Sequence, residues 1–186
     1  MENKTSAFLK SALNSGLIFG VILVILQLAF WMFGIMPIGI GKSMLMLLFN
    51  LVIYVIGIWW FTKSYRNGVL DGYINYGHAF LYGLTVFFIS TIILIIYNYI
   101  FTKFIDPEYV SRVFKATVNS TEEMMRKRGI PDSTISETID KMNAKGLPSQ
   151  LKSAVTSLIG GVIMGAIVSL ISSAFAKKVQ DPFKES

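Results

Sequence analysis

Side chains that commonly take part in chemistry are few in this chain, and they are scattered. The sequence has one histidine, His78, and no cysteine, which excludes thiolate nucleophiles and thiolate metal sites. A single imidazole with only Asp71 nearby does not supply the ligand set of a metal site. There is also no G-x-S-x-G motif and no phosphate-binding glycine loop. We therefore expect a protein that is not an enzyme, with no catalytic residue, no bound metal and no cofactor.

Three amide side chains stand inside long apolar segments, where a polar group must find a partner. They are Gln27, Asn50 and Asn98. Amides in hydrocarbon usually turn inward and hydrogen-bond to another helix, so contacts that hold helices together are the default interpretation. The alternative is a path for a neutral solute. Coupled ion or proton transport is disfavoured, because the apolar segments contain no carboxylate, histidine or arginine to line such a path.

Small side chains recur every four residues in the last apolar segment, which places them on one face of a helix. Helices in lipid associate through close backbone approach and van der Waals contact, and small residues permit that approach. We therefore predict helix packing at these positions, either within one bundle or between two copies of the chain. The stripe consists of Ser157, Gly161, Gly165, Ser169 and Ser173, and a shorter stripe in the first segment contains Gly16 and Gly20.

Four stretches without a charged residue must position these groups, and each is long enough to cross a bilayer. A spanning helix needs about 20 apolar residues. The hydrophobic content of 53% and the mean hydropathy of +0.58 also exceed those of ordinary soluble domains. We predict an all-α fold, a four-transmembrane-helix bundle that forms one integral membrane domain over residues 1–186. The spans are expected at about 14–36, 43–61, 79–101 and 151–176.

The segment 102–150, between the third and fourth spans, is polar but carries the signals of two helices. Asp106 is predicted to cap the first helix. Thr134 and Glu137 match a capping box at the start of the second, and Ser149 can cap the fourth span. Apolar residues at helical spacing give each loop helix one stripe. We therefore expect an extramembrane helical hairpin whose stripes pack on each other or on the membrane surface.

Basic residues in the short flanks predict the orientation of the spans. Those at the N-terminus, after the second span and at the C-terminus outnumber Lys42, which stands alone in the short turn on the other side. This pattern places both termini in the cytoplasm, although basic residues at the ends of the long loop oppose it. The net charge of +6 is spread over these flanks and the loop. Membrane lipids with anionic headgroups are therefore expected partners, and nucleic acid is not.

The segment after the second span contains Tyr65-Arg66 and Gly68, followed by Tyr76-Gly77-His78-Ala79-Phe80 and Gly83. With this segment, the span layout and the long loop, the whole chain resembles a family of small four-span bacterial membrane proteins. That family is known mainly from Bacteroidetes and is carried as a domain of unknown function. The resemblance implies a multi-pass protein of the bacterial inner membrane. It supplies no activity, ligand or catalytic residue.

Two functional interpretations from different classes remain. The first is a non-enzymatic scaffold or accessory subunit that acts through helix packing and its extramembrane loop, with a membrane protein or a second copy of the chain as partner. The second is a transport or permeability protein for a neutral or lipid-like solute. They differ in whether Gln27, Asn50 and Asn98 converge on one wet cavity or are paired from helix to helix with dry packing between them.

Overall fold

Six α-helices and one π-helical turn form the part of the chain that the computed structural model describes, residues 2–36, 38–147 and 149–179. The isolated antiparallel bridge between Ile74 and Lys178 is the β pairing found within these residues. The prediction of an all-α fold with a helical hairpin between the third and fourth spans is confirmed. The elements are α1 (Glu2–Met32), α2 (Ile40–Val69), α3 (Tyr76–Ile100), the π-helical turn η1 (Phe101–Ile105), α4 (Tyr109–Lys127), α5 (Asp132–Lys145) and α6 (Gln150–Ala176).

Four of these helices are long and apolar enough to cross a membrane: α1, α2, α3 together with η1, and α6. Their candidate spans contain 28, 29, 30 and 27 residues, more than the roughly 20 that the hydrocarbon core requires. Large apolar side chains cover their outer surface; Ile25, Leu45 and Trp60, for example, are 61%, 71% and 66% exposed. Such a surface is suited to lipid and not to water. The chain is a four-span membrane protein.

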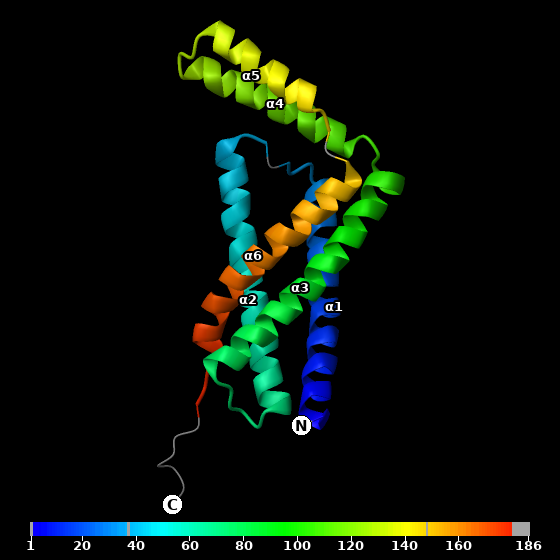
Figure 1. Ribbon diagram of the computed structural model, residues 1–186, viewed down its shortest axis with the longest axis vertical. Coiled ribbons are helices and arrows are strands. Elements are labelled where there is room, and N and C mark those ends of the chain that lie inside the picture. The colour runs from blue at the N-terminus through cyan, green and yellow to red at the C-terminus, as the bar shows by residue number, and fades with distance from the viewer. Residues whose placement is uncertain (1, 37, 148, 180–186) are drawn as a thin grey trace, which may run out of the picture.

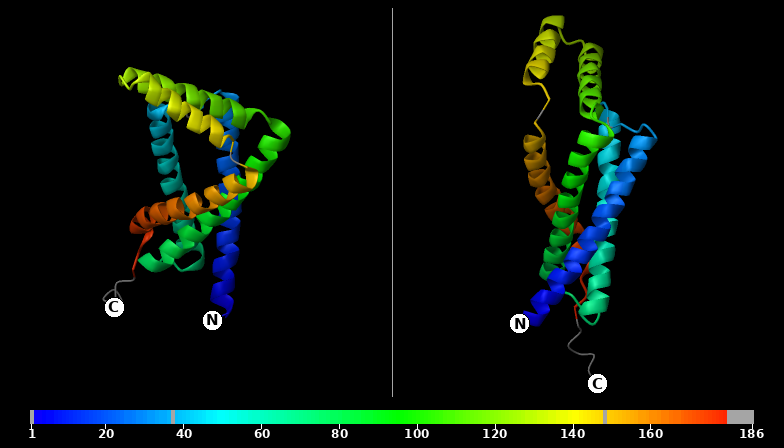
Figure 2. Two further views of the ribbon diagram at one scale, coloured as in Figure 1. Left: turned by 45° about the horizontal axis from the view of Figure 1, so that its top comes forward. Right: turned by 90° about the vertical axis from the view of Figure 1, so that its right-hand side faces the viewer.

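Helix α3 occupies the centre of the bundle. It packs along α1 on one side and along α6 on the other, and α2 packs mainly on α6. Figure 1 shows the two described ends of the chain at one end of the bundle and the hairpin of α4 and α5 at the opposite end. Toward the hairpin, the N-terminal half of α2 leans away from α3 and α6, as the views in Figures 1 and 2 agree. The bundle is therefore closed near the termini and open near the hairpin.

The buried core of the bundle lies mainly in the closed half. The largest fully buried side chain is Tyr82 on α3, whose ring stacks on Tyr65 of α2 with the centroids 4.1 Å apart. The Tyr82 hydroxyl bonds the hydroxyls of Ser11 and Ser15 on α1, at 3.0 and 2.9 Å. Arg66 of α2 donates to the carbonyl oxygen of Ala176 at the end of α6, at 2.7 Å. These contacts join all four spans at the end of the bundle that holds the termini.

The hairpin differs from the sequence prediction at its helix starts. Helix α4 begins at Tyr109, three residues after Asp106, so Asp106 does not cap it. Helix α5 begins at Asp132, before the proposed capping box, and no side chain caps its first turn. The cap of α6 is confirmed, because the Ser149 hydroxyl accepts from the Lys152 amide at 3.3 Å. The two hairpin helices pack on each other and bury three apolar side chains, Val118, Met125 and Ile135.

Candidate functional site

The three amides predicted within the spans lie on three different helices. Gln27 of α1 donates from Nε2 to Oδ1 of Asn98 on α3, at 3.2 Å. Asn98 in turn donates from Nδ2 to the Leu94 carbonyl one turn earlier, at 2.8 Å. Asn50 of α2 donates to the Met46 carbonyl of its own helix, also at 2.8 Å. The first pair joins α1 to α3, whereas Asn50 makes no side-chain contact of this kind with another helix within the described residues.

These amides line one cavity of about 460 Å³ between α1, α2, α3 and α6. Among its described lining residues none is charged. Hydroxyl groups add polar points to a wall that is otherwise aliphatic, aromatic or glycine. The lining residues beyond the amides are Leu23, Leu26, Phe30, Trp31, Ile35, Met46, Tyr54, Phe87, Thr91, Leu94, Ile95, Tyr109, Ser157, Gly160, Gly161 and Met164.

The cavity lies where the bundle opens. Its inner end is closed by Leu23 of α1 and Phe87 of α3, which are only 4% and 5% exposed. Its other end reaches Trp31 and Tyr109, near the base of the hairpin. The half of α2 that contains Asn50 leans away from α3 and α6 (Figure 2). The space is therefore enclosed on the side of the termini and accessible beside α2.

Two amide oxygens of the cavity are available to a bound molecule. Oε1 of Gln27 and Oδ1 of Asn50 accept no hydrogen bond from the described part of the chain. Polar atoms in an apolar setting normally find a partner, supplied by protein, water or a ligand. Both are acceptors, and a hydroxyl or amide donor on a small molecule could satisfy them. The arrangement can bind and orient a neutral molecule.

An ion-paired carboxylate fixes the rim of the cavity. Oδ2 of Asp106 accepts from Nε1 of Trp31, at 3.0 Å, and from the guanidinium of Arg112, and the Asp106 carbonyl accepts from the Tyr109 amide at 3.1 Å. The hydrogen bond from Arg112, with smaller help from Trp31, holds the pKa of the Asp106 carboxyl below its usual range. Asp106 directly follows the π-helical turn η1, a feature frequent near functional sites. Sequence reasoning missed this role, because it assigned Asp106 to a helix cap.

The small-residue positions lie mostly against α3. A Cβ atom built on Gly161 would be 2.5 Å from Cγ2 of Thr91, and one on Gly165 would be 2.8 Å from Cδ1 of Phe87. Such distances are shorter than real Cβ contacts, so only glycine permits this approach of α6 to α3. Gly16 and Gly20 of α1 approach the other side of α3 in the same way. Their added Cβ atoms would lie 2.6 Å from Ile89 and 2.8 Å from Ile93.

The serines of the stripe divide between core and cavity. Ser169 and Ser173 are buried, and the Ser169 hydroxyl has no hydrogen-bond partner within the described residues. Ser157, nearer the hairpin, is exposed and lines the cavity. The stripe therefore follows the opening of the bundle: it packs on α3 where the helices touch and faces the cavity where they separate. The face that could have joined two copies is occupied by α3 of the same chain.

The lone histidine lies away from the cavity. Its Nε2 is 3.3 Å from the hydroxyl of Tyr65, near the closed end of the bundle. In the part of the chain that the structure describes, no group of three histidine, aspartate or glutamate side chains could hold a metal ion.

A family model described as a protein of unknown function, DUF4199, matches residues 14–178, from within α1 through the hairpin to the end of α6. No curated protein and no solved structure matches the chain.

Proposed function

We propose that this chain, which belongs to the DUF4199 family of proteins of unknown function, binds a neutral, lipid-like solute in its intramembrane cavity and moves it within or across the bilayer. The role is non-enzymatic, so the solute leaves chemically unchanged. The proposal rests on one observation. A single cavity is lined by amide side chains from three helices, Gln27, Asn50 and Asn98.

The lining of the cavity supports the chemical class of this solute. A charged molecule would leave water for a site without a counter-charge, and that transfer is strongly unfavourable in a low-dielectric environment. A neutral molecule with an apolar body avoids this cost. Its hydroxyl or amide donors can pair with Gln27 and Asn50, while the aromatic and aliphatic walls cover the rest. A volume of about 460 Å³ is typical of small-molecule sites.

The direction of access also favours a lipid-like solute. The cavity lies among the spanning helices, and its wall on α2 belongs to the half of that helix that leans away from α3 and α6 (Figure 1). A solute entering from this side arrives from the hydrocarbon region and not from water. Apolar molecules already partition into that region. The amides then distinguish a solute with a polar group from a plain hydrocarbon.

A scaffold or accessory role is the second candidate, and the hairpin favours it. Helices α4 and α5 extend beyond the spans and pack chiefly on each other (Figure 1). A helical pair outside the membrane offers a surface to a membrane protein partner. The two roles require different regions. Variants that fill the cavity should impair solute handling alone, and variants on the outer face of α5 should impair partner binding alone.

The same proposal places the protein in the bacterial inner membrane with both termini in the cytoplasm. The beginning of α1, the turn between α2 and α3 and the end of α6 lie at the same end of the bundle (Figure 1). That end carries Lys10, Lys63 and Lys177. Basic residues in short flanks are retained on the cytoplasmic side, so they support this orientation.

Photo-crosslinking tests the proposed binding. The protein in lipid nanodiscs would be exposed to a neutral monoacylglycerol with a diazirine in its chain, and labelled peptides would be identified by mass spectrometry. We expect saturable labelling of cavity residues such as Met46, Tyr54 and Leu94. Unlabelled monoacylglycerol should compete, and a long-chain alkane should not. Labelling confined to outward-facing residues such as Leu45 and Ile163, without saturation, would contradict the proposal.

A further inference from the structure

A second hollow lies at the hairpin end of the spans, between the start of α2 and the inner side of α4. It has a volume of about 730 Å³ and shares no lining residue with the cavity described above. We name it the interfacial groove. The groove is lined by Gly39, Gly41, Ser43, Met44, Leu47, Thr117, Ser120, Thr121, Glu123, Met124, Lys127 and Arg128.

One wall of the interfacial groove is apolar and belongs to a membrane-spanning helix. Met44 and Leu47 of α2 are 56% and 50% exposed, and they follow Lys42, the last charged residue before the apolar stretch of α2. Basic residues flank a span where it leaves the hydrocarbon. The groove therefore lies at the boundary between the acyl chains and the headgroups. Near Gly39 the two walls meet, because a Cβ atom there would lie 3.0 Å from Oγ of Ser120.

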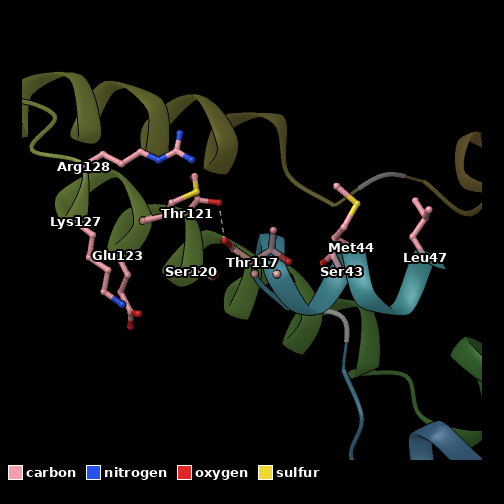
Figure 3. A pocket seen from close by; sticks show the side chains of 12 residues that line it. Ser43, Met44, Leu47, Thr117, Ser120, Thr121, Glu123, Lys127 and Arg128 are labelled. Carbon is pink, nitrogen blue, oxygen red and sulfur yellow. Dashed lines mark hydrogen bonds between the residues drawn. The ribbon is translucent and has the colours of Figure 1, made fainter. Parts of the chain in front are cut away.

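The other wall carries two cations that form no salt bridge with the described residues. Arg112, Arg126 and Lys141 of the hairpin each have a carboxylate oxygen within 4.0 Å. Lys127 and Arg128 make no such pair with the described residues. Figure 3 shows Arg128 reaching from the end of α4 toward the α2 side of the groove.

Hydroxyl groups lie beside these cations, and one carboxylate opposes them. Ser120 and Thr121 add polar contacts along α4, and the Thr121 hydroxyl donates to the Thr117 carbonyl at 2.8 Å. Glu123 and Lys127 project together, on the side of α4 away from the Arg128 guanidinium (Figure 3). The lining thus contains two positive charges and one negative charge, and it has a net attraction for an anion.

We propose that the interfacial groove binds an anionic glycerophospholipid. The phosphate lies against Arg128, with Lys127 adding longer-range attraction, and an acyl chain follows Met44 and Leu47 into the bilayer. Guanidinium and ammonium groups form charge-assisted hydrogen bonds with phosphate oxygens. The exposed apolar wall at the same site matches the chain that a lipid carries and that a free phosphate ion lacks. This site does not depend on the solute cavity, since the two share no lining residue.

Lipid titration followed by native mass spectrometry tests the site. Detergent-solubilised protein would be titrated with dioleoylphosphatidylglycerol, with dioleoylglycerol and with inorganic phosphate. We expect the first phosphatidylglycerol molecule to bind more tightly than further phosphatidylglycerol molecules. Neither dioleoylglycerol nor inorganic phosphate should displace it. Displacement by inorganic phosphate at equal concentration would show a site for the free ion. Displacement by dioleoylglycerol would show that the site does not recognise the phosphate group. Either result would overturn the proposal.

Matched charge variants locate the binding. A basic residue near a membrane surface contributes about fivefold in affinity for anionic lipid. K127Q/R128Q should therefore weaken phosphatidylglycerol binding about 25-fold. K115Q/K145Q removes the same charge from exposed hairpin positions outside the groove and should leave the affinity within about twofold. Glu123→Gln should strengthen binding, because it removes the opposing charge. Equal loss in the two double variants, or weaker binding in Glu123→Gln, would overturn the proposal.

Discussion

Gln27 on α1 and Asn98 on α3 form a hydrogen bond of 3.2 Å between helices, and both face the same cavity. The contact is structural and functional at once. It holds α1 against α3, as amides in hydrocarbon commonly do, and it leaves Oε1 of Gln27 without a partner in the described part of the chain. The two interpretations drawn from the sequence treated pairing and convergence as alternatives. In this bundle Gln27 and Asn98 show both, whereas Asn50 lines the same cavity and bonds only within its own helix among the described residues.

The close approach of α6 to α3 predicts that two adjacent glycines differ in how well they tolerate alanine. Gly161→Ala places a methyl group against Thr91 and should lower the free energy of unfolding by about 1–3 kcal/mol, the usual cost of overpacking. Gly160→Ala meets nothing within 4 Å and should be neutral or stabilising. Thermal unfolding in detergent, followed by circular dichroism, measures both. Equal stability of the two variants would contradict the close packing of these helices.

The hairpin depends on one deeply buried side chain of α5. Ile135 is 3% exposed, and an aspartate there would place an unpaired charge in the seam with α4. We expect Ile135→Asp to make the hairpin cleave much faster with trypsin, while the spans stay inserted. Ser136→Asp, at the exposed neighbouring position, should be cleaved like wild type. The outcome against this account is an equal cleavage rate for all three proteins on a gel time course.

Asp106 predicts how the rim of the cavity responds to acid. Its pKa in the folded protein lies below the unfolded value because of Arg112, so the charged form is the one that the fold stabilises. That contribution is present above the unfolded pKa of about 3.9 and is lost as pH falls through the folded value. Asp106→Asn should therefore speed hydrogen exchange at the hairpin base at pH 7. It should also reduce the loss of stability that acid causes there. Hydrogen exchange of residues 101–112 measures both effects. An unchanged acid dependence in the variant would assign it to other carboxyl groups.

The orientation can be tested directly, because the chain contains no native cysteine. Single cysteines at the exposed positions Ser6 and Asn67 should be protected from a membrane-impermeant maleimide in intact cells. A cysteine at Asn119, exposed on α4, should react. The labelling is read as a mass shift on gels, with permeabilised cells as the control for reactivity. Labelling at Asn67 but not at Asn119 would invert the topology.

Hydropathy predicted the spans well because lipid imposes a simple requirement on composition. It was less accurate for the helix ends: α1 ends at Met32, before the expected residue 36, and α2 continues to Val69, past Lys63 and Arg66. The reason for the longer α2 is that charged residues end the contact with hydrocarbon and not the backbone hydrogen bonding. The assignment of Asp106 to a cap failed for a related reason. Local spacing could not show that Trp31 and Arg112, far apart in sequence, would both bind its carboxylate.

The candidate site was only partly predictable. Residue types identified Gln27, Asn50 and Asn98 as polar groups in lipid, but their convergence depends on the rotation and tilt of three helices. Tyr54 and Tyr109 gave no distinguishing signal in the sequence, because aromatic residues are common in and near spans. Ser157 was noticed for its spacing in the packing stripe. Its place in the cavity follows from the divergence of the helices, which no local pattern encodes.

Filling the cavity tests directly whether a solute binds there. Gly160 lines the cavity, and a Cβ atom built there would meet no neighbouring atom within 4 Å. Gly160→Leu should therefore occupy the space without disturbing the helix contacts. Gly68→Leu adds the same volume in open space on α2, outside the cavity. With the photoreactive monoacylglycerol in nanodiscs, we predict that Gly160→Leu loses at least about 80% of the saturable labelling at Met46 and Leu94, whereas Gly68→Leu labels like wild type. Full labelling of these residues in Gly160→Leu would contradict the account.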